Sequence, residues 1–486
     1  MEKKDLKPAG VFKYFEEICQ VPRPSKKEEK MIAYLKAFGA KHNLETKVDE
    51  AGNVLIKKPA TPGKENLQTV VLQSHIDMVC EKNNDVQHDF LTDPIETEID
   101  GEWLKAKGTT LGADNGIGVA TELAILADDS IEHGPLECLF TVDEETGLTG
   151  AFALQEGFMS GDILLNLDSE DEGEIFIGCA GGIDSVAEFT YKEVVVPAGY
   201  FFFKVEVKGL KGGHSGGDIH LGRGNANKIL NRFLSRMAAR HDLYLCEING
   251  GNLRNAIPRE AYAICAVPED AKHDVRTELN IFTSEMEDEL SVVEPDLKLV
   301  LESEAPRKTA IDQDTTTRLL KALYAAPHGV YAMSQDIPGL VETSTNLASI
   351  KMKPNHVIRI ETSQRSSILS ARNDMANTVR AVFQLAGANV TFGEGYPGWK
   401  PNPHSAILEV AVESYKRLFG IDAKVKAIHA GLECGLFLDK YPTLDMISFG
   451  PTLTGVHSPD ERMLIPTVEK FWKHLLDILA HVPAKK

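Results

Sequence analysis

Residues 70–77 have the sequence Val-Val-Leu-Gln-Ser-His-Ile-Asp, in which a short apolar run is followed directly by polar and ionisable side chains. An apolar run of this kind predicts a strand that is buried on both faces, as in the central sheet of an α/β domain. Functional sites of such domains are built where the strands reach their carboxyl ends. This stretch therefore predicts an α/β fold with His75 near a functional site.

His75 and Asp77 are two positions apart, so in an extended chain their side chains point to the same face. If His75 binds a metal ion, Asp77 can accept its second imidazole N–H, which fixes the tautomer and raises the basicity of the ring. Taken alone, however, the pair is more often an ordinary surface histidine at the end of a strand.

Two further apolar runs also end in carboxylates. The predicted strand 136–142 leads into Asp-Glu-Glu-Thr-Gly, and the predicted strand 163–167 leads into Asp168. Adjacent residues at a strand end point to opposite sides, so one of Glu144 and Glu145 can bind a metal ion while the other faces a metal-bound water as a general base. Taken singly, each acidic segment is also typical of a solvated turn.

A glycine-rich segment, Gly-Ala-Asp-Asn-Gly-Ile-Gly at 112–118, precedes the predicted helix 119–127. It has neither the GxGxxG nor the GK[ST] pattern of phosphate-binding loops, so the signal for a nucleotide site is weak. A capping residue beside a glycine turn would explain the segment without any function. Asp114 is nonetheless free to bridge two metal ions.

The C-terminal part of the chain adds a second histidine. The segment 455–461, Gly-Val-His-Ser-Pro-Asp-Glu, follows the predicted strand 444–449 and precedes a last helix that starts near Pro466. With His457, imidazole and carboxylate groups follow several separate apolar strands. Together they predict a metal site.

The chemistry of these groups indicates which metal they would bind. The positive charges of two divalent ions would balance the negative charges of three carboxylates and one bridging hydroxide. The hydroxide forms at neutral pH because coordination lowers the pKa of water toward ~7. Histidine and carboxylate ligands suit Zn²⁺ in an open catalytic site, and Mn²⁺ or Co²⁺ could substitute. The seven cysteines are scattered and contain no CxxC pair, so they favour neither a thiolate zinc site nor a disulfide framework.

The composition limits the class of protein. The 486 residues exceed the size of about 250 to 300 residues at which one core stops growing, so two or three domains are expected. Hydrophobic residues make up 43% and charged residues 26%, as in globular proteins. The formal net charge of −20 disfavours nucleic acids and anionic membrane surfaces as partners. Because the chain has no apolar leader and no run of ~18 apolar residues, we expect a cytoplasmic protein.

The sequence pattern changes after Gly181-Gly182. Residues 201–207 alternate between apolar and other side chains as in a half-exposed strand, and residues 226–239 have apolar side chains at helical spacing. A dense turn cluster at 393–398 precedes a return to the first pattern. We therefore expect a discontinuous α/β domain, residues 1–187 and 393–486, that is interrupted by an inserted α+β domain, residues 188–392.

The motifs SHIDMV, GADNGIG, DEETG, NLD and GVHSPDE, in this order, resemble those of the M20 family of co-catalytic zinc peptidases. The segments KGGHSGGDIHLGRGNANK, GGNLRNAIPRE and AGLECGLF are similar to its aminoacyl-histidine dipeptidase branch. The resemblance implies a phosphorylase/hydrolase-like peptidase domain with an inserted lid and dimerisation domain, and two Zn²⁺ per subunit. It implies His75 and Asp168 as ligands of one zinc, Glu145 and His457 as ligands of the other, Asp114 as the bridge, Glu144 as general base and Asp77 as the residue that orients His75.

The rest of the chain contains further candidates. His214 lies between two glycine pairs that would let the backbone approach a ligand, although a tight hairpin with a solvent-facing histidine explains the pattern as well. The resemblance implies that His214, together with Asn255, stabilises the oxyanion of the scissile carbonyl. It also implies that Arg365 binds the substrate's terminal carboxylate through its guanidinium fork, with an ordinary exposed arginine as the alternative. Glu433 is expected to contact a free amino terminus.

These features predict a dipeptidase that hydrolyses dipeptides, including Xaa-His substrates of the β-alanyl-histidine type, with a hydroxide bound to two zinc ions. One alternative is an M20 enzyme that removes N-acyl groups or trims longer peptides, and another is a non-catalytic metal-binding scaffold. Glu144 argues against the scaffold, because ligation alone needs no general base. A strand and an amphipathic helix in the inserted domain predict a homodimer that forms through exposed strand edges.

Overall fold

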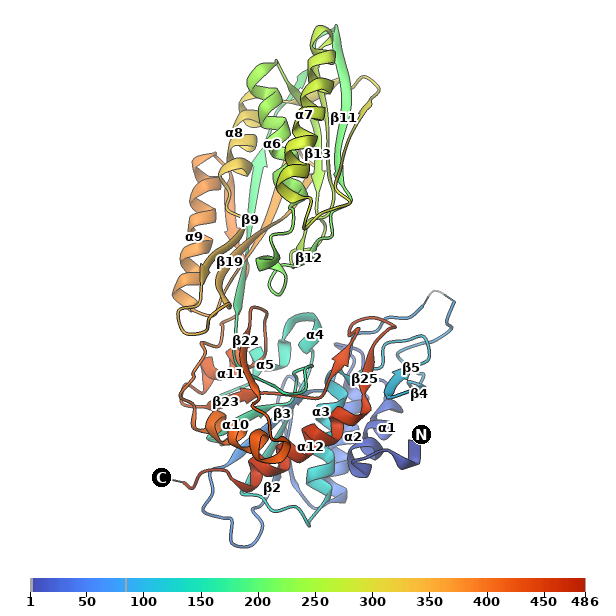
Figure 1. Cartoon of the computed structure of the whole chain (residues 1–486), viewed down its shortest axis with the longest axis vertical. Helices are drawn as coiled ribbons and strands as arrows, with labels where there is room; N and C mark the ends of the chain where they lie inside the picture. Colours follow the sequence, from blue (N-terminus) through green and yellow to red (C-terminus); the bar gives the residue numbers. More distant parts are fainter. Residues whose placement is uncertain (1–2, 84, 486) are drawn as a thin grey trace. The chain divides into compact units, whose positions relative to one another are not determined.

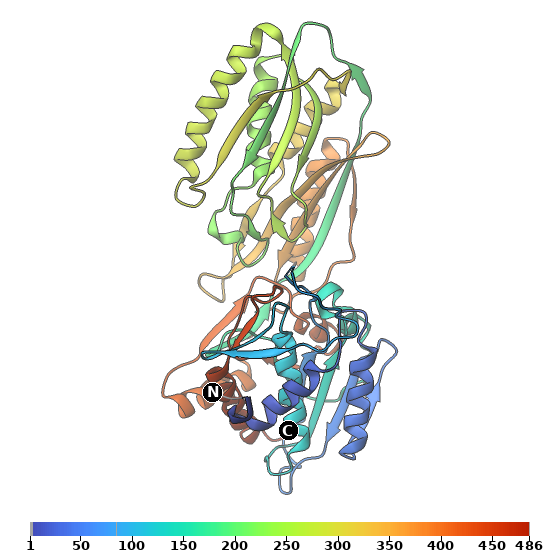
Figure 2. The ribbon, with the colours of Figure 1, turned by 90° about the vertical axis from the view of Figure 1, so that its right-hand side faces the viewer.

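The chain divides into two compact units, which are drawn in Figures 1 and 2. The structure is a computed structural model, and it describes residues 3–83 and 85–485. The first unit consists of Met1–Gly178, Trp399–Ala427 and Glu433–Lys486, and the second consists of Cys179–Gly398 and Ile428–Leu432.

The domain boundaries expected from the sequence, after residues 187 and 392, both fall inside the second unit. Gly181 starts a continuous strand, β9 (Gly181–Thr190), so the second unit begins before this strand and not after its first residues. The backbone N–H of Gly182 donates to the carbonyl of Tyr396 at 3.0 Å, and the N–H of Tyr396 donates back at 2.8 Å. These bonds tie the turn cluster around Tyr396 to the start of β9, which explains why that cluster belongs to the second unit.

An eight-stranded mixed sheet forms the centre of the first unit. In spatial order its strands are β1 (Glu45–Val48), β2 (Val54–Lys58), β6 (Leu136–Thr141), β3 (Val70–His75), β7 (Ile163–Asn166), β23 (Asp445–Ser448), β8 (Glu174–Cys179) and β22 (Lys424–Ile428). The strand β3 runs parallel to β6 and β7, and β23 runs parallel to β7. Every residue of β3, β6 and β7 is buried, so both faces of the sheet are covered, as the apolar runs predicted.

Helices pack on this sheet and on one another. The longer ones are α1 (Ala9–Cys19), α2 (Glu29–Lys41), α3 (Ala113–Ala127), α10 (Ala406–Phe419) and α12 (Ile465–Ala480), and the short ones are η1 (Lys3–Asp5), α4 (Glu144–Gly147), α5 (Thr149–Ala153) and α11 (Cys434–Lys440). The helix α3 packs between β3 and α1, and α10 packs between β23 and α12. The closing helix α12 buries Val468, Phe471, Leu475 and Leu479, as its spacing predicted. None of the helices in the described part of the chain has the length and apolar content of a membrane span.

A small four-stranded sheet links the C-terminal segment of the first unit to the region before α3. Its strands are β24 (Leu453–Thr454), β25 (Arg462–Leu464), β5 (Trp103–Ala106) and β4 (Thr97–Asp100), in this order. The predicted motif 455–461 forms the connection between β24 and β25. The pairing of β25 with β5 therefore fixes where His457 enters the unit.

The second unit is built on an antiparallel sheet that is covered by helices on one face (Figure 1). The sheet contains β9 with β11 (Tyr200–Lys208), β13 (Tyr244–Gly250), β15 (Ala261–Pro268), β16 (Lys298–Ser303), β18 (Gly329–Met333), β19 (Val341–Lys353), β20 (Val357–Ser366) and β21 (Asn389–Phe392). The covering helices are α6 (Ala226–Arg240), α7 (Lys272–Leu290), α8 (Gln313–Ala325) and α9 (Leu369–Leu385). Along β11, Phe201, Phe203, Val205 and Val207 all enter the same core as these helices, which confirms the predicted alternation.

The remaining short elements of the second unit include the pair that holds His214. The strand β12 (Gly213–His214) pairs with β14 (Ala256–Ile257), so that His214 lies opposite Ala256. The other short elements are β10 (Glu193–Val195), which pairs with β17 (Thr309–Ile311), and the helices η2 (Ile219–Leu221) and η3 (Glu269–Ala271).

Candidate active site

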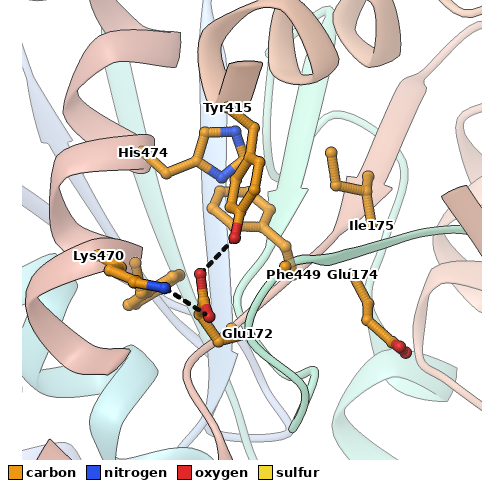
Figure 3. A pocket seen from close by; sticks show the side chains of 10 residues that line it. Glu172, Glu174, Ile175, Tyr415, Phe449, Lys470 and His474 are labelled. Carbon is orange, nitrogen blue, oxygen red and sulfur yellow. Dashed lines mark hydrogen bonds and ion pairs between the residues drawn. The ribbon is translucent and has the colours of Figure 1, made fainter. Parts of the chain in front are cut away.

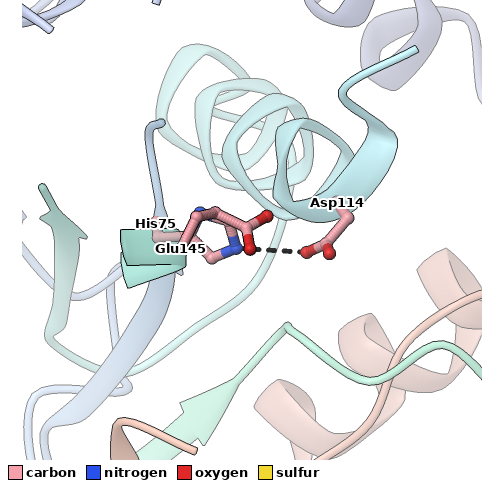
Figure 4. Close-up of side chains that lie close together, drawn as sticks. All are labelled: His75, Asp114 and Glu145. Carbon is pink, nitrogen blue, oxygen red and sulfur yellow. Dashed lines mark hydrogen bonds and ion pairs between the residues drawn. The ribbon is translucent and has the colours of Figure 1, made fainter. Parts of the chain in front are cut away.

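Three of the predicted metal ligands converge at the carboxyl edge of the first unit's sheet, as Figure 4 shows. His75 is the last residue of β3, Asp114 lies at the start of α3, and Glu145 lies in α4. Their candidate ligand atoms lie within 4.8 Å of one another. Three separate elements therefore supply one group of side chains that could hold a metal ion.

The carboxylate of Asp114 faces two histidines, one with each oxygen. Its Oδ1 lies 3.1 Å from Nε2 of His75, and its Oδ2 lies 3.2 Å from Nε2 of His457. A carboxylate in this position could bridge two metal ions, and each imidazole would hold one of them.

Each histidine also has a carboxylate partner of its own. Nε2 of His75 lies 3.3 Å from Oδ1 of Asp168, and Nε2 of His457 lies 3.0 Å from Oε2 of Glu145. The five side chains thus form two sets that share Asp114. This grouping is the one that the motif resemblance implied.

The site has the properties of a cation site. Oε1 of Glu145 is buried and accepts no hydrogen bond from any residue that the structure describes. Hydrogen bonds to Asp114 and Glu145 raise the pKa of His457 to about 11, while burial raises the pKa of Asp168 to about 6. Unpaired buried carboxylate oxygens are costly, so positive charge at this position is strongly favoured. Imidazole and carboxylate donors without thiolate fit Zn²⁺, Mn²⁺ or Co²⁺.

Asp77 connects the histidine of β3 to the glutamates of α4. Its Oδ1 lies 3.3 Å from Nδ1 of His75 and accepts the backbone N–H of Glu144 at 3.0 Å. Its Oδ2 accepts the N–H of Glu145 at 3.3 Å and the hydroxyl of Ser25 at 2.7 Å. Burial opposes ionisation, but the hydrogen bonds to His75 and Ser25 outweigh it and lower the pKa of Asp77, which therefore stays a carboxylate.

Glu144 and Glu145 both follow a turn and do not alternate along a strand. Asp143 has a left-handed backbone with φ of 50°, and the chain enters the short helix α4 directly after it, so the extended geometry expected for this pair is wrong. The side chain of Glu144 makes no hydrogen bond or ion pair with another described residue. Burial, with the nearby acidic groups Asp168 and Glu145, raises the pKa of Glu144 well above its ordinary value. A free carboxylate with a raised pKa suits a general base.

In the second unit, the structure fixes the tautomer of His214. Its Nδ1 accepts the backbone N–H of Gly217 at 3.0 Å, and burial followed by the charge of Arg365 lowers its pKa to about 4. The ring is therefore neutral at pH 7 and has its hydrogen on Nε2. An imidazole in this state can donate a hydrogen bond to a carbonyl oxygen.

Asn255 lies close to His214 and lines the same cavity of about 710 Å³. The backbone carbonyl of Asn255 accepts the N–H of Ser215 at 2.8 Å, next to the pairing of β12 with β14. The Asn255 side chain itself is exposed. The structure thus brings together the two residues that the sequence analysis paired.

Arg365 is only 6% exposed, so the alternative of an ordinary exposed arginine is wrong. Its Nε donates to the hydroxyl of Ser215 at 3.3 Å, and one terminal nitrogen donates to the hydroxyl of Tyr396 at 3.0 Å. Across residues 3–83 and 85–485, no carboxylate forms an ion pair with it. A buried guanidinium without a counter-ion favours an anionic ligand. The sequence analysis did not identify Tyr396, because nothing in the sequence of the turn cluster indicates that this tyrosine contacts Arg365.

Glu433 is fully buried in the first unit. Its Oε2 accepts hydrogen bonds from Nε2 of Gln73 at 2.7 Å and from the hydroxyl of Thr141 at 2.8 Å. Its Oε1 has no hydrogen-bond partner among the residues described. Burial raises the pKa of Glu433 to about 8. One carboxylate oxygen is therefore already occupied, and the other remains open to a donor.

Another cavity, which lies in the first unit and is shown in Figure 3, does not offer a comparable site. It measures about 10 Å³, room for no more than one water molecule. The carboxylate of Glu172, which lines it, already accepts hydrogen bonds from the hydroxyl of Tyr415 and the ammonium of Lys470. His474 likewise pairs with the carbonyl of Ala411 at 2.8 Å. This cavity is a packed polar cluster.

Comparison with known proteins supports the reading of the motifs. Residues 71–481 match the model of peptidase family M20/M25/M40. The chain is 47% identical to the cytosol non-specific dipeptidase of Escherichia coli K12 over 484 residues, which covers 100% of both chains.

Solved structures with this fold include one at high identity. The aminoacylhistidine dipeptidase of Vibrio alginolyticus is 46% identical, with a TM-score of 0.91 over 100% of this chain and 99% of the other. Aminopeptidase PepT of Bacillus cereus is 16% identical, with a TM-score of 0.61 over 98% and 99% of the two chains, and shares the fold. The mixed main sheet and the inserted antiparallel sheet are therefore those of a known peptidase architecture.

Proposed function

The chain belongs to peptidase family M20 and is a metal-dependent dipeptidase of the aminoacylhistidine dipeptidase type, and we propose that it hydrolyses free dipeptides, including Xaa-His substrates, with two zinc ions. The observation that supports the two-metal proposal best is the carboxylate of Asp114, whose two oxygens face His75 and His457. The cytoplasm is the location of this enzyme, in keeping with the name of its relative in Escherichia coli.

In this proposal the five clustered side chains hold the metal ions. His75 and Asp168 would hold one ion, His457 and Glu145 would hold the other, and Asp114 would bridge them. When bound, the ions polarise the peptide carbonyl and lower the pKa of a water molecule toward ~7. Asp77 accepts the second N–H of His75 and so keeps Nε2 free for the metal. Mn²⁺ or Co²⁺ can replace zinc with this donor set.

Glu144 transfers the proton in this proposal. It takes the proton from the attacking water and gives it to the nitrogen of the leaving amine, so one carboxylate serves both half-steps. Its position next to the proposed ligand Glu145 and its lack of other hydrogen-bond partners among the described residues support this role. The backbone N–H of Glu144 is anchored on Asp77 at 3.0 Å, which holds the base next to the ligands.

Four further residues are assigned to substrate recognition in this proposal. The Nε2–H of His214 and the side chain of Asn255 stabilise the negative charge that develops on the carbonyl oxygen. Arg365 binds the terminal carboxylate, and Tyr396 orients its guanidinium through the 3.0 Å hydrogen bond. Oε1 of Glu433 is the acceptor that a substrate ammonium group would use.

The buried charge of Arg365 also bears on the alternative substrates. A longer peptide would have its carboxylate further from the cleaved bond, which leaves Arg365 unpaired. An N-acyl amino acid keeps that carboxylate but lacks the free ammonium group, so Arg365 alone does not exclude it. Glu144 argues against a metal-binding scaffold, because no ligand role requires it.

We also propose that the first unit is the catalytic domain and that the second unit serves as a lid and as the interface of a homodimer. The strand β18 pairs only with β19 among the described strands, which leaves one strand edge unpaired. Its side chains Val330, Tyr331 and Met333 are 40%, 62% and 47% exposed. An edge strand with exposed apolar side chains is suited to pairing with a second copy around a twofold axis.

Metal removal tests the proposed mechanism. Dialysis against a chelator should abolish cleavage of a free dipeptide, and addition of Zn²⁺, Co²⁺ or Mn²⁺ should restore it. Full activity in a metal-free sample would refute the two-metal mechanism.

A further inference from the structure

Glu461 is a buried carboxylate that the proposed reaction does not use. It is 2% exposed and lies just before β25. Its Oε2 accepts the backbone N–H groups of Leu111 at 2.7 Å and of Gly112 at 2.9 Å. Its Oε1 accepts those of Ala113 at 2.8 Å and of Asp114 at 3.3 Å. One carboxylate therefore binds four consecutive amides, the last of which belongs to the proposed bridging ligand.

These bonds connect two metal-binding segments that are far apart in the sequence. Glu461 shares the β24–β25 connection with His457, and the amides that it binds lead into α3 with Asp114. The connection is itself braced, since the hydroxyl of Ser458 donates to the carbonyl of Gly455 at 2.6 Å. A displacement of Glu461 would thus move His457 relative to Asp114.

Arg23 provides a second brace on the same loop. The guanidinium is 2% exposed and donates to the carbonyls of Ile76 at 3.2 Å, Asp77 at 3.1 Å and Gly112 at 2.6 Å. A Cβ atom at Gly112 would lie 2.6 Å from its Nη2 atom, and a Cβ at Gly116 would do the same. Gly112 and Gly116 therefore make room for Arg23, which explains these two glycines without a phosphate ligand.

From this geometry we infer that Glu461 is a positioning residue that sets the distance between the two halves of the metal centre by fixing the Asp114 loop to the His457 loop. The inference rests on the proposed metal binding but concerns a residue that contacts neither metal nor substrate. Both oxygens must be acceptors, because each binds two N–H donors. A glutamine at this position would direct an NH₂ group at two of those donors and open the contact.

The test compares Glu461→Gln with Asp460→Asn, a control that neutralises the exposed neighbouring carboxylate. Zinc affinity is measured by competition with a chromophoric chelator, and the visible spectrum of the Co²⁺-substituted protein reports ligand geometry. We expect Glu461→Gln to weaken zinc binding about 10- to 100-fold and to alter the cobalt spectrum. Asp460→Asn should match the wild type. A purely structural role would lower the stability of the metal-free protein and leave both metal readouts unchanged.

Hydrogen exchange of the metal-free protein gives a readout that does not depend on metal. The amides of residues 111–114 should be protected in the wild type and should exchange at least about tenfold faster in Glu461→Gln. The inference would be overturned if Glu461→Gln bound zinc as tightly as the wild type. If the variant does not fold, unprotected amides of residues 111–114 in the wild type would overturn it. If the wild type bound no zinc, the proposed function would fail instead. Equal hydrogen exchange of these amides in the wild type and in Glu461→Gln would overturn the inference independently of zinc.

Discussion

Nε2 of His457 lies 3.2 Å from Oδ2 of Asp114, although 343 positions separate the two residues in the chain. The contact exists because the β24–β25 connection returns to the start of α3 after the whole second unit has been inserted. The C-terminal segment therefore completes the group of side chains that we propose as the metal centre.

Zinc binding should release protons. In the metal-free protein, hydrogen bonds to Asp114 and Glu145 raise the pKa of His457 to about 11. Burial lowers the pKa of His75, but the carboxylates of Asp168 and Asp114 outweigh this effect and raise that pKa well above its ordinary value. Both rings are thus protonated at pH 7, and zinc binds only the neutral ring. Raising the pH removes the competing protons, so zinc affinity should increase with pH.

Calorimetry in buffers with different protonation enthalpies measures this effect. We expect about two zinc ions to bind per chain with release of about two protons at pH 7. Heats that do not depend on the buffer would contradict the proposed histidine ligands.

Glu144→Gln should separate metal binding from catalysis. The variant keeps all five proposed ligands and loses only the proton acceptor, so zinc content should be unchanged while kcat falls by about 10²- to 10⁴-fold. The adjacent variant Glu145→Gln is the matched control and should lose zinc. A fully active Glu144→Gln protein would show that another group is the base.

Arg365→Ala should discriminate between charged and uncharged substrates. Loss of a buried partner of the carboxylate should cost about 2 kcal/mol or more on a free dipeptide, which is a decrease in kcat/KM of about 30-fold. The corresponding dipeptide amide lacks the charge and should be affected far less. Arg359→Ala, on the same strand β20, should leave both substrates unchanged. Equal losses on the two substrates would show that Arg365 does not recognise the carboxyl end.

Light scattering at micromolar concentration should report twice the chain mass of 53.3 kDa. Tyr331→Glu places a charge on the exposed edge strand β18 and should shift the protein to the monomer. Leu385→Glu, at an even more exposed apolar position on the end of α9, should remain dimeric. A monomeric wild type would refute the dimer and leave the dipeptidase assignment intact.

The strands of the first unit could be predicted because burial on both faces requires continuous apolar runs. The runs before His75, Glu144 and Asp168 correspond to β3, β6 and β7. A site at the ends of these strands could be expected because sites in such sheets form at the carboxyl edge. The alternation in β11 was equally visible, since only one of its faces enters the core.

Other features depend on backbone geometry that no residue pattern reveals. Arg23 lies in an irregular segment between two prolines, and its partners are carbonyl groups. Glu461 binds amides about 350 positions away, so no side-chain spacing indicates the contact. The left-handed turn at Asp143 redirects Glu144 and Glu145, and although aspartate tolerates this conformation better than most residues, nothing in the sequence indicates that Asp143 adopts it. The expected boundary after residue 187 differs from the start of the second unit at Cys179, because β9 runs without interruption from Gly181 through that position.

Substrate length tests the dipeptidase assignment most directly. Initial rates of the zinc-loaded enzyme are compared on β-alanyl-histidine, on the same peptide extended by one residue, and on an N-acetyl amino acid. We predict that kcat/KM for the dipeptide exceeds that for each of the other two by about 100-fold or more, because only the dipeptide satisfies both the metal centre and the recognition of its charged ends. Cleavage of the tripeptide or of the N-acetyl amino acid at a comparable rate would contradict the assignment.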